Sequence, residues 1–498
     1  MRAGAAMSMV LSLAVVPSCG HASRQRQGAP AVTPPPAPPS SAIPTAAVEP
    51  EGDFSAVVAL VDDAIAAPRM PGAVVQIGHA GKIVFRRAFG SRKLAGEPGL
   101  DGSPAPAEPM TEDTLFDLAS LTKSLATATA VLQLAEQGRV GIDEPLQTYL
   151  PDFNPVNDPR RAKVTLRMLL THTSGLAGDL AMSGPWGLEK ADREEGIRRA
   201  LGTPLAFDPG AVFHYSDIGF ILLGMMVEKM TGETEDIYVA HNIFEPLGMV
   251  DTRYLPAVKA CGPHQIIGTA IAFDPKASRL SDCPAGTWST DLLARIAPTA
   301  RDEDTPGLNP NIDHLLRGTV HDPTARRMGG VAGSAGVFST VRDLGLFAQA
   351  LLDRLAGRPS AFPLTQATVA SMTTPQQPGH TAGQLAAANN AVHEAIRATP
   401  NGADPLLAPN YPAIPGQDLR GFGWDIDTAL SRPRGLIFPV GSFGQGGFTG
   451  TTLWVDPASE TYVIVLANVI HQRGGPPIVT LSGEVATETA RALGLYGN

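Results

Sequence analysis

The stretch AVVQIGHAGKIVF at residues 73–85 predicts a β-hairpin that turns near Ala80-Gly81. Far along the chain, GTTLWVDP at residues 450–457 and TYVIVLAN at residues 461–468 predict a second hairpin. Helical patterns occupy residues 54–66, much of the middle of the chain, and residues 478–493. Strands at both ends with helices between them predict one sheet assembled from both termini. The expected class is α/β or α+β, without an alternating βαβ array.

Composition narrows the classes of function. The chain has 498 residues, and 38 Lys+Arg against 48 Asp+Glu give a net charge of −10. That balance provides no electrostatic footprint for nucleic acid or for an acidic membrane surface. A hydrophobic content of 43% excludes wholesale disorder. No repeat recurs at a fixed period, and the Ala-, Asn- and Pro-rich residues 384–415 predict a surface insertion.

The first fifty residues are typical of an export signal and a tether. Arg2 precedes an apolar run over residues 3–16 that is too short to span a bilayer. The run ends at Cys19, which resembles the acylated cysteine of a lipoprotein signal. An ordinary secretory signal with an incidental cysteine is the alternative. We expect a signal peptide at residues 1–19, a Pro/Ala-rich linker at 20–52 and one folded domain at 53–498.

These expectations place the protein outside the cytoplasm, at the cell envelope, with a membrane contact only through a lipid on Cys19. Three cysteines cannot make a disulfide scaffold. In an oxidising compartment Cys261 and Cys283 could pair and close a loop of about 20 residues. Two unpaired buried thiols are the alternative, and the sequence does not choose between them.

A candidate nucleophile lies in FDLASLTKS, residues 116–124. Apolar residues recur at helical spacing from Leu121 and Gly138 is a natural stop, so Ser120 is expected at or just inside a helix start. Lys123 lies one turn on and faces the same way. A Lys whose pKa is lowered by burial or a second cation can activate a hydroxyl or relay its proton. The alternative is a Ser N-cap followed by a solvated Lys.

Two further features carry possible chemistry. Tyr215 follows a turn at residues 208–210 and precedes a helix expected at 218–230, so its phenol could serve as a proton shuttle beside a Lys. The alternative is a core Tyr with Asp217 as the helix N-cap. The run GQGGFTG at residues 444–450 would let a strand backbone approach a ligand closely, or would simply form a hairpin turn.

Taken together and in order, these segments resemble the serine β-lactamase and penicillin-binding-protein superfamily, most of all its class C β-lactamase-related esterases. Five more segments match in the family's order from about residue 54 to the end of the chain: LLTHTSGL (169–176), FEPLGM (244–249), GGVAG (329–333), GFGW (421–424) and GFTGT (447–451). The resemblance implies the β-lactamase/transpeptidase-like fold, a central antiparallel sheet flanked by helices, with a mostly helical middle subdomain.

The resemblance also implies roles. Ser120 would attack a carbonyl and form an acyl-enzyme, while Lys123 and Tyr215 would share the proton transfers. The backbone N–H groups of Ser120 and Phe448 would form the oxyanion hole. Asp217 stands where the family often has Asn, lining the cleft. We expect neither a metal nor a cofactor, because no metal-ligand spacing, phosphate loop or dinucleotide fingerprint occurs.

Two departures from the family pattern bear on the substrate. The third motif usually has Lys or His, then Thr or Ser, then Gly; this chain has Gln445, Gly446 and Gly447. Asp217 adds negative charge to the cleft. Both changes disfavour carboxylate-bearing substrates, since each lost charge-assisted hydrogen bond is worth about 1.5–3 kcal/mol. Ester or amide hydrolysis is therefore expected ahead of β-lactamase or D,D-carboxypeptidase activity. Weak β-lactam turnover stays open because Gln still donates hydrogen bonds.

Other interpretations are weaker. A non-catalytic envelope binding protein could retain the fold, but it would have no reason to keep Ser120, Lys123 and Tyr215 together. AGSAG at residues 332–336 nearly matches a nucleophile elbow, with Ser334 as nucleophile and His471 as base. His172 is expected to be structural. The partner is expected to be a small-molecule ester, amide or β-lactam, and the oligomeric state is open.

Overall fold

The computed structural model describes residues 51–498, except 275, 278–282, 399–410, 473–479 and 498. The expected signal peptide, Cys19 and almost all of the expected linker lie outside the described residues. The described residues belong to one compact unit. Among the described residues, no helix combines the length and the apolar character needed to cross a bilayer.

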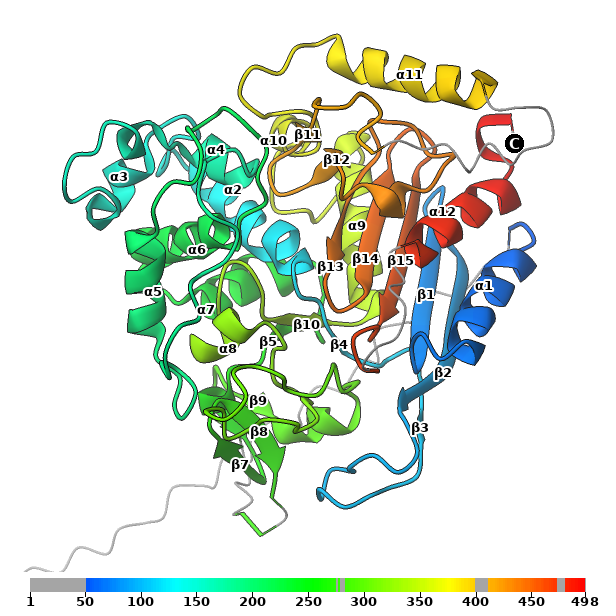
Figure 1. The fold of residues 1–498 in the computed structure, drawn as a ribbon. Coiled ribbons are helices and arrows are strands. Elements are labelled where there is room, and N and C mark those ends of the chain that lie inside the picture. Colours follow the sequence, from blue (N-terminus) through cyan, green and yellow to red (C-terminus); the bar gives the residue numbers. More distant parts are fainter. Residues whose placement is uncertain (1–50, 275, 278–282, 399–410, 473–479, 498) are drawn as a thin grey trace, which may run out of the picture. The chain divides into compact units, whose positions relative to one another are not determined.

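An eight-stranded antiparallel sheet runs in the order β11-β12-β13-β14-β15-β1-β2-β3 (Figure 1). The first and last long strands are neighbours in it, with Val75 of β1 opposite Val465 of β15. The expectation of one sheet built from both termini is confirmed. The strands are β1 (Gly72–His79), β2 (Lys82–Lys93), β3 (Glu108–Pro109), β11 (Leu419–Arg420), β12 (Asp425–Asp427), β13 (Phe443–Gly447), β14 (Thr451–Asp456) and β15 (Thr461–Ala467).

Both faces of the central strands are buried, and each face meets different helices. Ala73 and Val75 of β1 belong to the core beneath α1 (Ser55–Ala66) and α12 (Leu481–Ala492). Val74 points the other way, into the larger core that contains α9 (Val341–Leu355). In Figure 1, α1 and α12 cover one side of the sheet and α9 the other. The strands are therefore apolar on both faces, because successive side chains alternate between two cores.

A mostly helical region fills the middle of the chain, as expected. Its central helix, α6, packs against α2, α4, α5 and α7 and is buried over most of its length. The helices of the region are α2 (Thr129–Glu136), α3 (Leu146–Tyr149), α4 (Leu166–Leu170), α5 (Arg193–Gly202), α6 (Asp217–Thr231), α7 (Glu235–Val239) and α8 (Pro323–Arg327).

Short strands connect this region to the sheet. A three-stranded sheet has the order β4-β10-β5, and two-stranded pairs form between β6 and β9 and between β7 and β8. These strands are β4 (Phe116–Asp117), β5 (Arg253–Tyr254), β6 (Ala260–Cys261), β7 (His264–Ile267), β8 (Ala270–Phe273), β9 (Trp288–Ser289) and β10 (Val337–Ser339). Cys261 in β6 forms a disulfide with Cys283, so the pairing left open by the sequence is resolved.

The Ala- and Asn-rich stretch after residue 384 is a helix, which the sequence interpretation did not anticipate. Helix α11 (Gln384–Ala398) follows α10 (Gln366–Met372). Ala388 is buried, and the Asn389 side chain donates to the Val440 carbonyl at 2.7 Å. The composition predicted a surface insertion without assigning it a helix, and Leu385, Ala388 and Val392 provide an apolar stripe at helical spacing.

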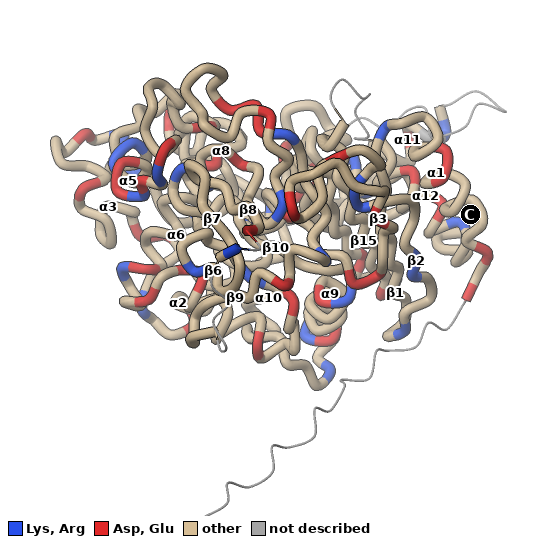
Figure 2. The backbone as a smooth tube through the Cα atoms, turned by 90° about the horizontal axis from the view of Figure 1, so that it is seen from below, with Lys and Arg blue, Asp and Glu red and all other residues tan. Residues whose placement is uncertain are grey.

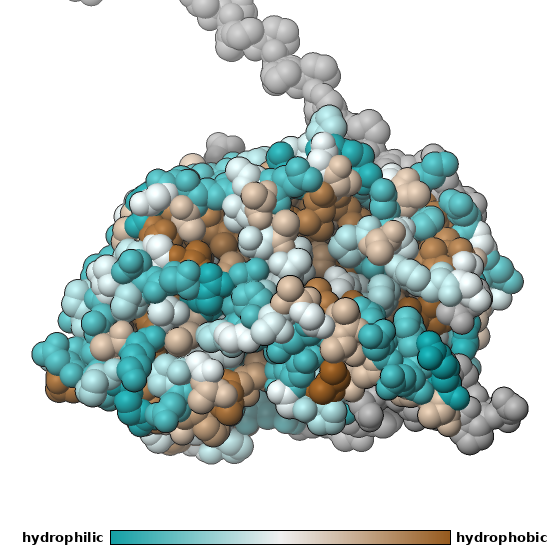
Figure 3. Space-filling model, turned by 90° about the horizontal axis from the view of Figure 1, so that it is seen from above, coloured by the Kyte–Doolittle hydropathy of each residue, from teal (hydrophilic) through white to brown (hydrophobic). Residues whose placement is uncertain are grey.

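Two views describe the surface of the described residues. Acidic and basic residues are interspersed along the described backbone (Figure 2). On the face shown in Figure 3, apolar residues lie mostly in recesses between hydrophilic ones.

Candidate active site

Ser120 sits on a sharp turn between strand β4 and a helix. The chain leaves β4 at Asp117, passes through Ala119 with φ of 46°, and enters a helix at Leu121. A positive φ in a residue with a Cβ costs about 1–3 kcal/mol and persists only where neighbours hold it. The Asp117 carboxylate does so by accepting the Ala119 N–H at 3.0 Å. The expectation of Ser120 at a helix start is confirmed.

The first turns of this helix are not α-helical. Residues Lys123–Ala128 form a π-helical segment, η1, before α2 begins at Thr129. π-Helical turns are rare and often occur at functional sites. The helix ends beside Gly138, whose φ of 69° confirms it as the stop.

The end of the glycine-rich strand β13 and the turn that follows it pack directly against the Ser120 turn. The Thr449 hydroxyl donates to the Asp117 carbonyl at 2.7 Å, and the Thr451 hydroxyl donates to the Leu118 carbonyl at 3.0 Å. A Cβ on Gly447 would lie 2.4 Å from the Leu118 carbonyl oxygen. Only glycine fits this approach, so the run at residues 444–450 provides both a close backbone contact and a hairpin turn.

Lys123 is buried and points at Ser120. Its Nζ lies 3.0 Å from Ser120 Oγ, 2.8 Å from the Ser334 carbonyl oxygen and 2.5 Å from Asp217 Oδ1. Burial acts to lower the pKa of Lys123, but the charges of Asp217 and Tyr215 outweigh it and raise the pKa well above its ordinary value. A lowered pKa was the condition under which Lys123 could act as a base, and the Asp217 carboxylate acts in the opposite direction. Lys123 is therefore a protonated, positively charged donor, because the neighbouring Asp217 carboxylate stabilises its charge.

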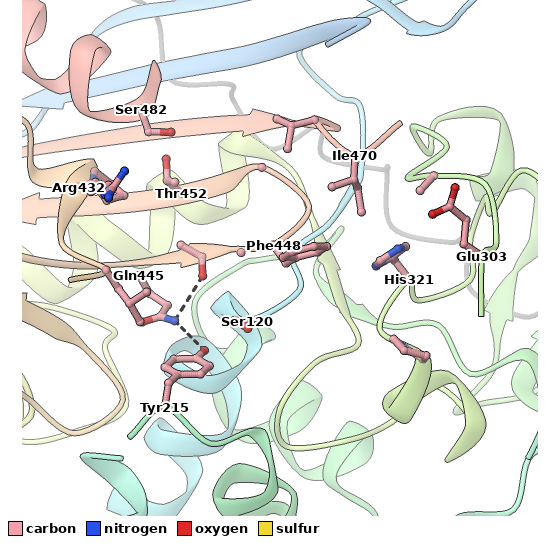
Figure 4. A pocket seen from close by; sticks show the side chains of 18 of the residues that line it. Ser120, Tyr215, Glu303, His321, Arg432, Gln445, Phe448, Thr452, Ile470 and Ser482 are labelled. Atoms are coloured by element: carbon pink, nitrogen blue, oxygen red, sulfur yellow. Dashed lines mark hydrogen bonds between the residues drawn. The ribbon is translucent and has the colours of Figure 1, made fainter. Parts of the chain in front are cut away.

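Tyr215 faces the same cleft. Its hydroxyl accepts a hydrogen bond from Gln445 Nε2 at 3.2 Å (Figure 4), and its ring centroid lies 5.1 Å from Lys123 Nζ. Behind it, the His172 ring stacks at 4.1 Å between centroids. His172 Nδ1 accepts the Ser216 N–H at 3.0 Å. Burial, together with the charges of Arg420 and Lys123, holds the pKa of His172 well below its ordinary range. His172 is thus a neutral ring that supports Tyr215.

Asp217 does not cap helix α6; the Ser216 hydroxyl does, accepting the Gly219 N–H at 3.2 Å. This corrects the alternative in which Asp217 was the N-cap, and it frees the Asp217 carboxylate for Lys123. Two more carboxyls surround Asp217. Burial and the Asp217 charge raise the pKa of Asp322 to about 7, and the same two causes raise the pKa of Asp179. The sequence indicated no role for Asp322 or Asp179, because neither residue is close to Lys123 along the chain.

The two expected oxyanion donors are available. Within the described chain, the backbone N–H groups of Ser120 and Phe448 make no hydrogen bond. Phe448 follows directly after β13, and its side chain is 73% exposed. The ring lies parallel to His321, with centroids 6.0 Å apart. The exposed Phe448 ring and the His321 ring together form an apolar wall beside Ser120. The sequence had indicated no role for His321.

These groups line one cleft of about 1220 Å³, large enough for a small organic substrate. Figure 4 shows Gln445 and Tyr215 on one side of Ser120, and Phe448 and His321 on the other. All five lie in the cleft wall, together with Gly446 and Gly447. Lys123 and Asp217 lie beneath it.

Other candidates do not assemble into sites. Ser334 is buried and uses its carbonyl oxygen to accept from Lys123. His471 lies elsewhere, between Glu97 at 2.8 Å and the Pro298 carbonyl at 2.9 Å. The nucleophile-elbow alternative is therefore wrong. Within the described ranges, no three side chains of His, Cys, Asp or Glu gather as metal ligands.

Comparison with known proteins identifies the family of this chain. The sequence profile of the Beta-lactamase family matches residues 57–476. A protein named "Putative D-alanyl-D-alanine carboxypeptidase" from Escherichia coli K12 is 28% identical over 410 residues, covering 80% of this chain and 78% of its own. An N-acetylmuramyl-L-alanine amidase from Bacillus subtilis 168 is 29% identical over 416 residues, with the same coverages of 80% and 78%.

Among solved structures, unliganded simvastatin synthase (LovD) from Aspergillus terreus aligns with a TM-score of 0.55 at 23% identity, covering 88% of this chain and 98% of that one. This similarity shows the fold. With the profile match over most of the chain, it confirms the expected β-lactamase/transpeptidase-like architecture. The chain belongs to the beta-lactamase family, whose members include penicillin-binding-protein-like serine hydrolases.

Proposed function

We propose that this protein is an exported serine hydrolase that acts through an acyl-enzyme on Ser120. The observation that carries the proposal is the contact of 3.0 Å between Lys123 Nζ and Ser120 Oγ, beneath a cleft with two unused backbone donors. Ser120 attacks the substrate carbonyl, and the N–H groups of Ser120 and Phe448 stabilise the oxyanion. Water then hydrolyses the acyl-enzyme.

The charge on Lys123 determines which side chain can accept the proton of Ser120. A protonated Lys123 cannot accept the Ser120 proton, so it serves as a fixed cation that stabilises the serine alkoxide and a phenolate. Tyr215, as its phenolate, takes the proton from Ser120 Oγ and, as the resulting phenol, hands it to the leaving group. Asp217 keeps Lys123 charged, and Gln445 orients the Tyr215 hydroxyl through its hydrogen bond of 3.2 Å.

We favour carboxylic esters or amides over β-lactams as substrates. Gln445 is nearly buried, and its amide donates to Tyr215 and to the Gly446 carbonyl at 3.3 Å. A neutral, engaged amide at this position supplies no charge for the carboxylate of a β-lactam. The names of the two bacterial relatives support a second candidate, hydrolysis of cell-wall peptides or amides.

The envelope is the proposed location. The disulfide between Cys261 and Cys283 supports it, because such bonds persist in oxidising compartments. The names of the bacterial relatives refer to cell-wall substrates. The proposed lipid anchor is Cys19.

A rate comparison tests the proposal. Short-chain p-nitrophenyl esters, nitrocefin and a D-alanyl-D-alanine peptide would be assayed with the purified protein and with Ser120→Ala as the control. We expect ester turnover that Ser120→Ala abolishes. Faster turnover of nitrocefin or of the peptide would overturn the substrate preference.

Fluorophosphonate labelling tests the nucleophile separately. We expect wild type to be labelled and Ser120→Ala to remain unlabelled. A folded wild type that is neither labelled nor active on any of the three substrates would support a non-catalytic binding protein instead.

A further inference from the structure

A buried carboxyl group contacts the π-helical segment that carries Lys123. Glu235 is the first residue of α7, is fully buried and does not line the cleft. Its Oε1 lies 2.6 Å from the hydroxyl of Thr127, which belongs to η1. A Cβ on Gly224 of α6 would lie 2.4 Å from Glu235 Oε2, so the missing side chain makes room for the carboxyl group between α6 and η1.

The Thr127 hydroxyl has two partners but only one proton. It lies 2.7 Å from the Gly333 carbonyl oxygen as well as 2.6 Å from Glu235 Oε1. A carbonyl oxygen and an ionised carboxylate can both only accept, so a single hydroxyl proton cannot serve the two contacts. Both contacts are hydrogen bonds when Glu235 is protonated, because Glu235 then donates to Thr127 and Thr127 donates to Gly333.

The surroundings of Glu235 favour the protonated form. Its Oε2 is buried without a hydrogen-bond partner among the described residues. Two acids, Glu228 and Asp236, lie nearby, and Glu228 Oε1 accepts the Glu235 N–H at 3.0 Å. The opposing charge of Arg193 is already paired with Glu228 at 2.6 Å. Burial and the charge of Glu228 therefore raise the pKa of Glu235 to about 8.

The Gly333 carbonyl belongs to a row of four successive carbonyl groups that each accept from a side chain. Arg193 donates to Val331 at 2.7 Å, Tyr254 to Ala332 at 3.2 Å, Thr127 to Gly333 at 2.7 Å and Lys123 to Ser334 at 2.8 Å. The last two donors come from the same segment, η1. The row also packs tightly on α6, since a Cβ on Gly333 would lie 2.1 Å from the Phe220 carbonyl oxygen. A shift of the Gly333 carbonyl therefore also moves the adjacent carbonyl that holds Lys123.

We propose that Glu235 is a positioning residue that acts as a protonated acid: it donates to Thr127, which holds the Gly333 and Ser334 carbonyls in place for Lys123. The proposal rests on the proposed function of Ser120, whose Oγ lies 3.0 Å from Lys123 Nζ.

Loss of the Glu235 proton to solvent reverses the direction of the network. The Thr127 hydroxyl then donates to the ionised carboxylate, because a charged acceptor binds a proton donor more strongly than a carbonyl does. The Gly333 carbonyl loses its donor, and the contact between Ser334 and Lys123 shifts. Lys123 keeps its charge, since Asp217 still pairs with it, but its position relative to Ser120 changes.

The pH dependence of kcat tests this role. In wild type, kcat for a p-nitrophenyl ester should fall about fivefold to a lower plateau as pH rises through about 8. Glu235→Gln keeps a donor for Thr127 at every pH, so it should keep the wild-type kcat at pH 7 and remove the step. The matched control Glu233→Gln, which removes an exposed carboxyl, should retain the step. A wild type without the step, or a step that persists in Glu235→Gln, would overturn the proposal.

Two substitutions of Thr127 test the link between Glu235 and the carbonyl row. Thr127→Val removes the hydroxyl at nearly constant shape and should lower kcat about tenfold with little change in KM, because the network touches no substrate. The step near pH 8 should also disappear, since Glu235 then has no route to Gly333. Thr127→Ser keeps the hydroxyl and should retain both the activity and the step. Wild-type kcat in Thr127→Val would overturn the proposal.

An NMR titration without substrate separates this inference from the proposed function. The protein would carry ¹³C at lysine Cε, and Lys123→Arg would identify the Lys123 signal. We expect this signal to shift near pH 8 in wild type and in Glu233→Gln, and to lose that component in Glu235→Gln. A Lys123 signal unaffected by Glu235→Gln would overturn the positioning role even in an active enzyme. A coupled signal in a protein that neither hydrolyses esters nor takes a fluorophosphonate label would retain the network and refute the serine hydrolase.

Discussion

Replacing Asp217 by Asn removes the charge that keeps Lys123 protonated. The two groups are 2.5 Å apart, and Lys123 and Asp217 are 1% and 19% exposed, so solvent screens the pair only slightly. Breaking a buried ion pair by removing one partner costs about 3–5 kcal/mol. At 1.36 kcal/mol per tenfold change, this corresponds to a decrease of about 10²- to 10⁴-fold in the proton affinity of Lys123. Asn keeps the shape of Asp217, so the change is mainly one of charge.

The loss of proton affinity at Lys123 can be measured in two ways, from the stability and from the rate as functions of pH. In wild type the raised pKa of Lys123 gives stability that is present below its unfolded pKa and is lost only as pH rises through the folded one. In Asp217→Asn the sign reverses, because burial then lowers the pKa of Lys123. The melting temperature of the variant should therefore rise from pH 6.5 to 9.5 relative to wild type.

The second readout is the rate. If a charged Lys123 is required, the alkaline limb of kcat/KM for an ester should move to lower pH in Asp217→Asn. Asp152→Asn, which removes an exposed carboxyl outside the cleft wall, is the control and should match wild type in both measurements. Superimposable profiles for Asp217→Asn and wild type would refute the assignment of Asp217 as the group that sets the charge of Lys123.

Three other predictions follow from the packing. Gly447→Ala should lower kcat by at least about tenfold, because the new Cβ would lie 2.4 Å from the Leu118 carbonyl and displace the Ser120 turn. The control is Gly202→Ala, whose new Cβ would meet nothing within 4 Å. Equal kcat values for Gly447→Ala and wild type would contradict the role of the close approach. Burial raises the pKa of Glu235 to about 8, so folding favours its protonated form and stability falls as pH rises from about 4.3 toward 8. Glu235→Gln should flatten this part of the profile of urea unfolding against pH, and an unchanged slope would count against the assignment. Reducing the disulfide between Cys261 and Cys283, 22 positions apart, should lower the free energy of unfolding by about 2–4 kcal/mol, and urea titrations that coincide with and without reductant would contradict this.

Several features were predictable because they are properties of neighbouring residues. The apolar runs and turn residues within residues 73–85 and 450–468 predicted the strands that meet at the centre of the sheet. The spacing of Ser120 and Lys123 predicted their contact, since residues three apart on a helix share a face. The helix at residues 384–398 was missed because its composition suggested a loop and its short apolar stripe was given too little weight.

The electrostatics of the site were not predictable in the same way. The sequence interpretation offered only Asp217 as the cap of α6, although Ser and Asp are both good N-cap residues. The choice depends on His172, which accepts the Ser216 N–H and fixes the start of the helix. Asp217 then pairs with Lys123, and its charge raises the pKa of Lys123 although burial alone would lower it.

The sequence by itself determined the fold class, the family and the Ser120–Lys123 pair, because periodicity and motif spacing are written locally along the chain. Only the tertiary structure decided that Asp217 pairs with Lys123 and that Thr449 and Thr451 hold the nucleophile turn. Each of these contacts joins elements far apart in the chain. The packing of the sheet against its helices brings them together, and no local pattern of residues encodes that packing.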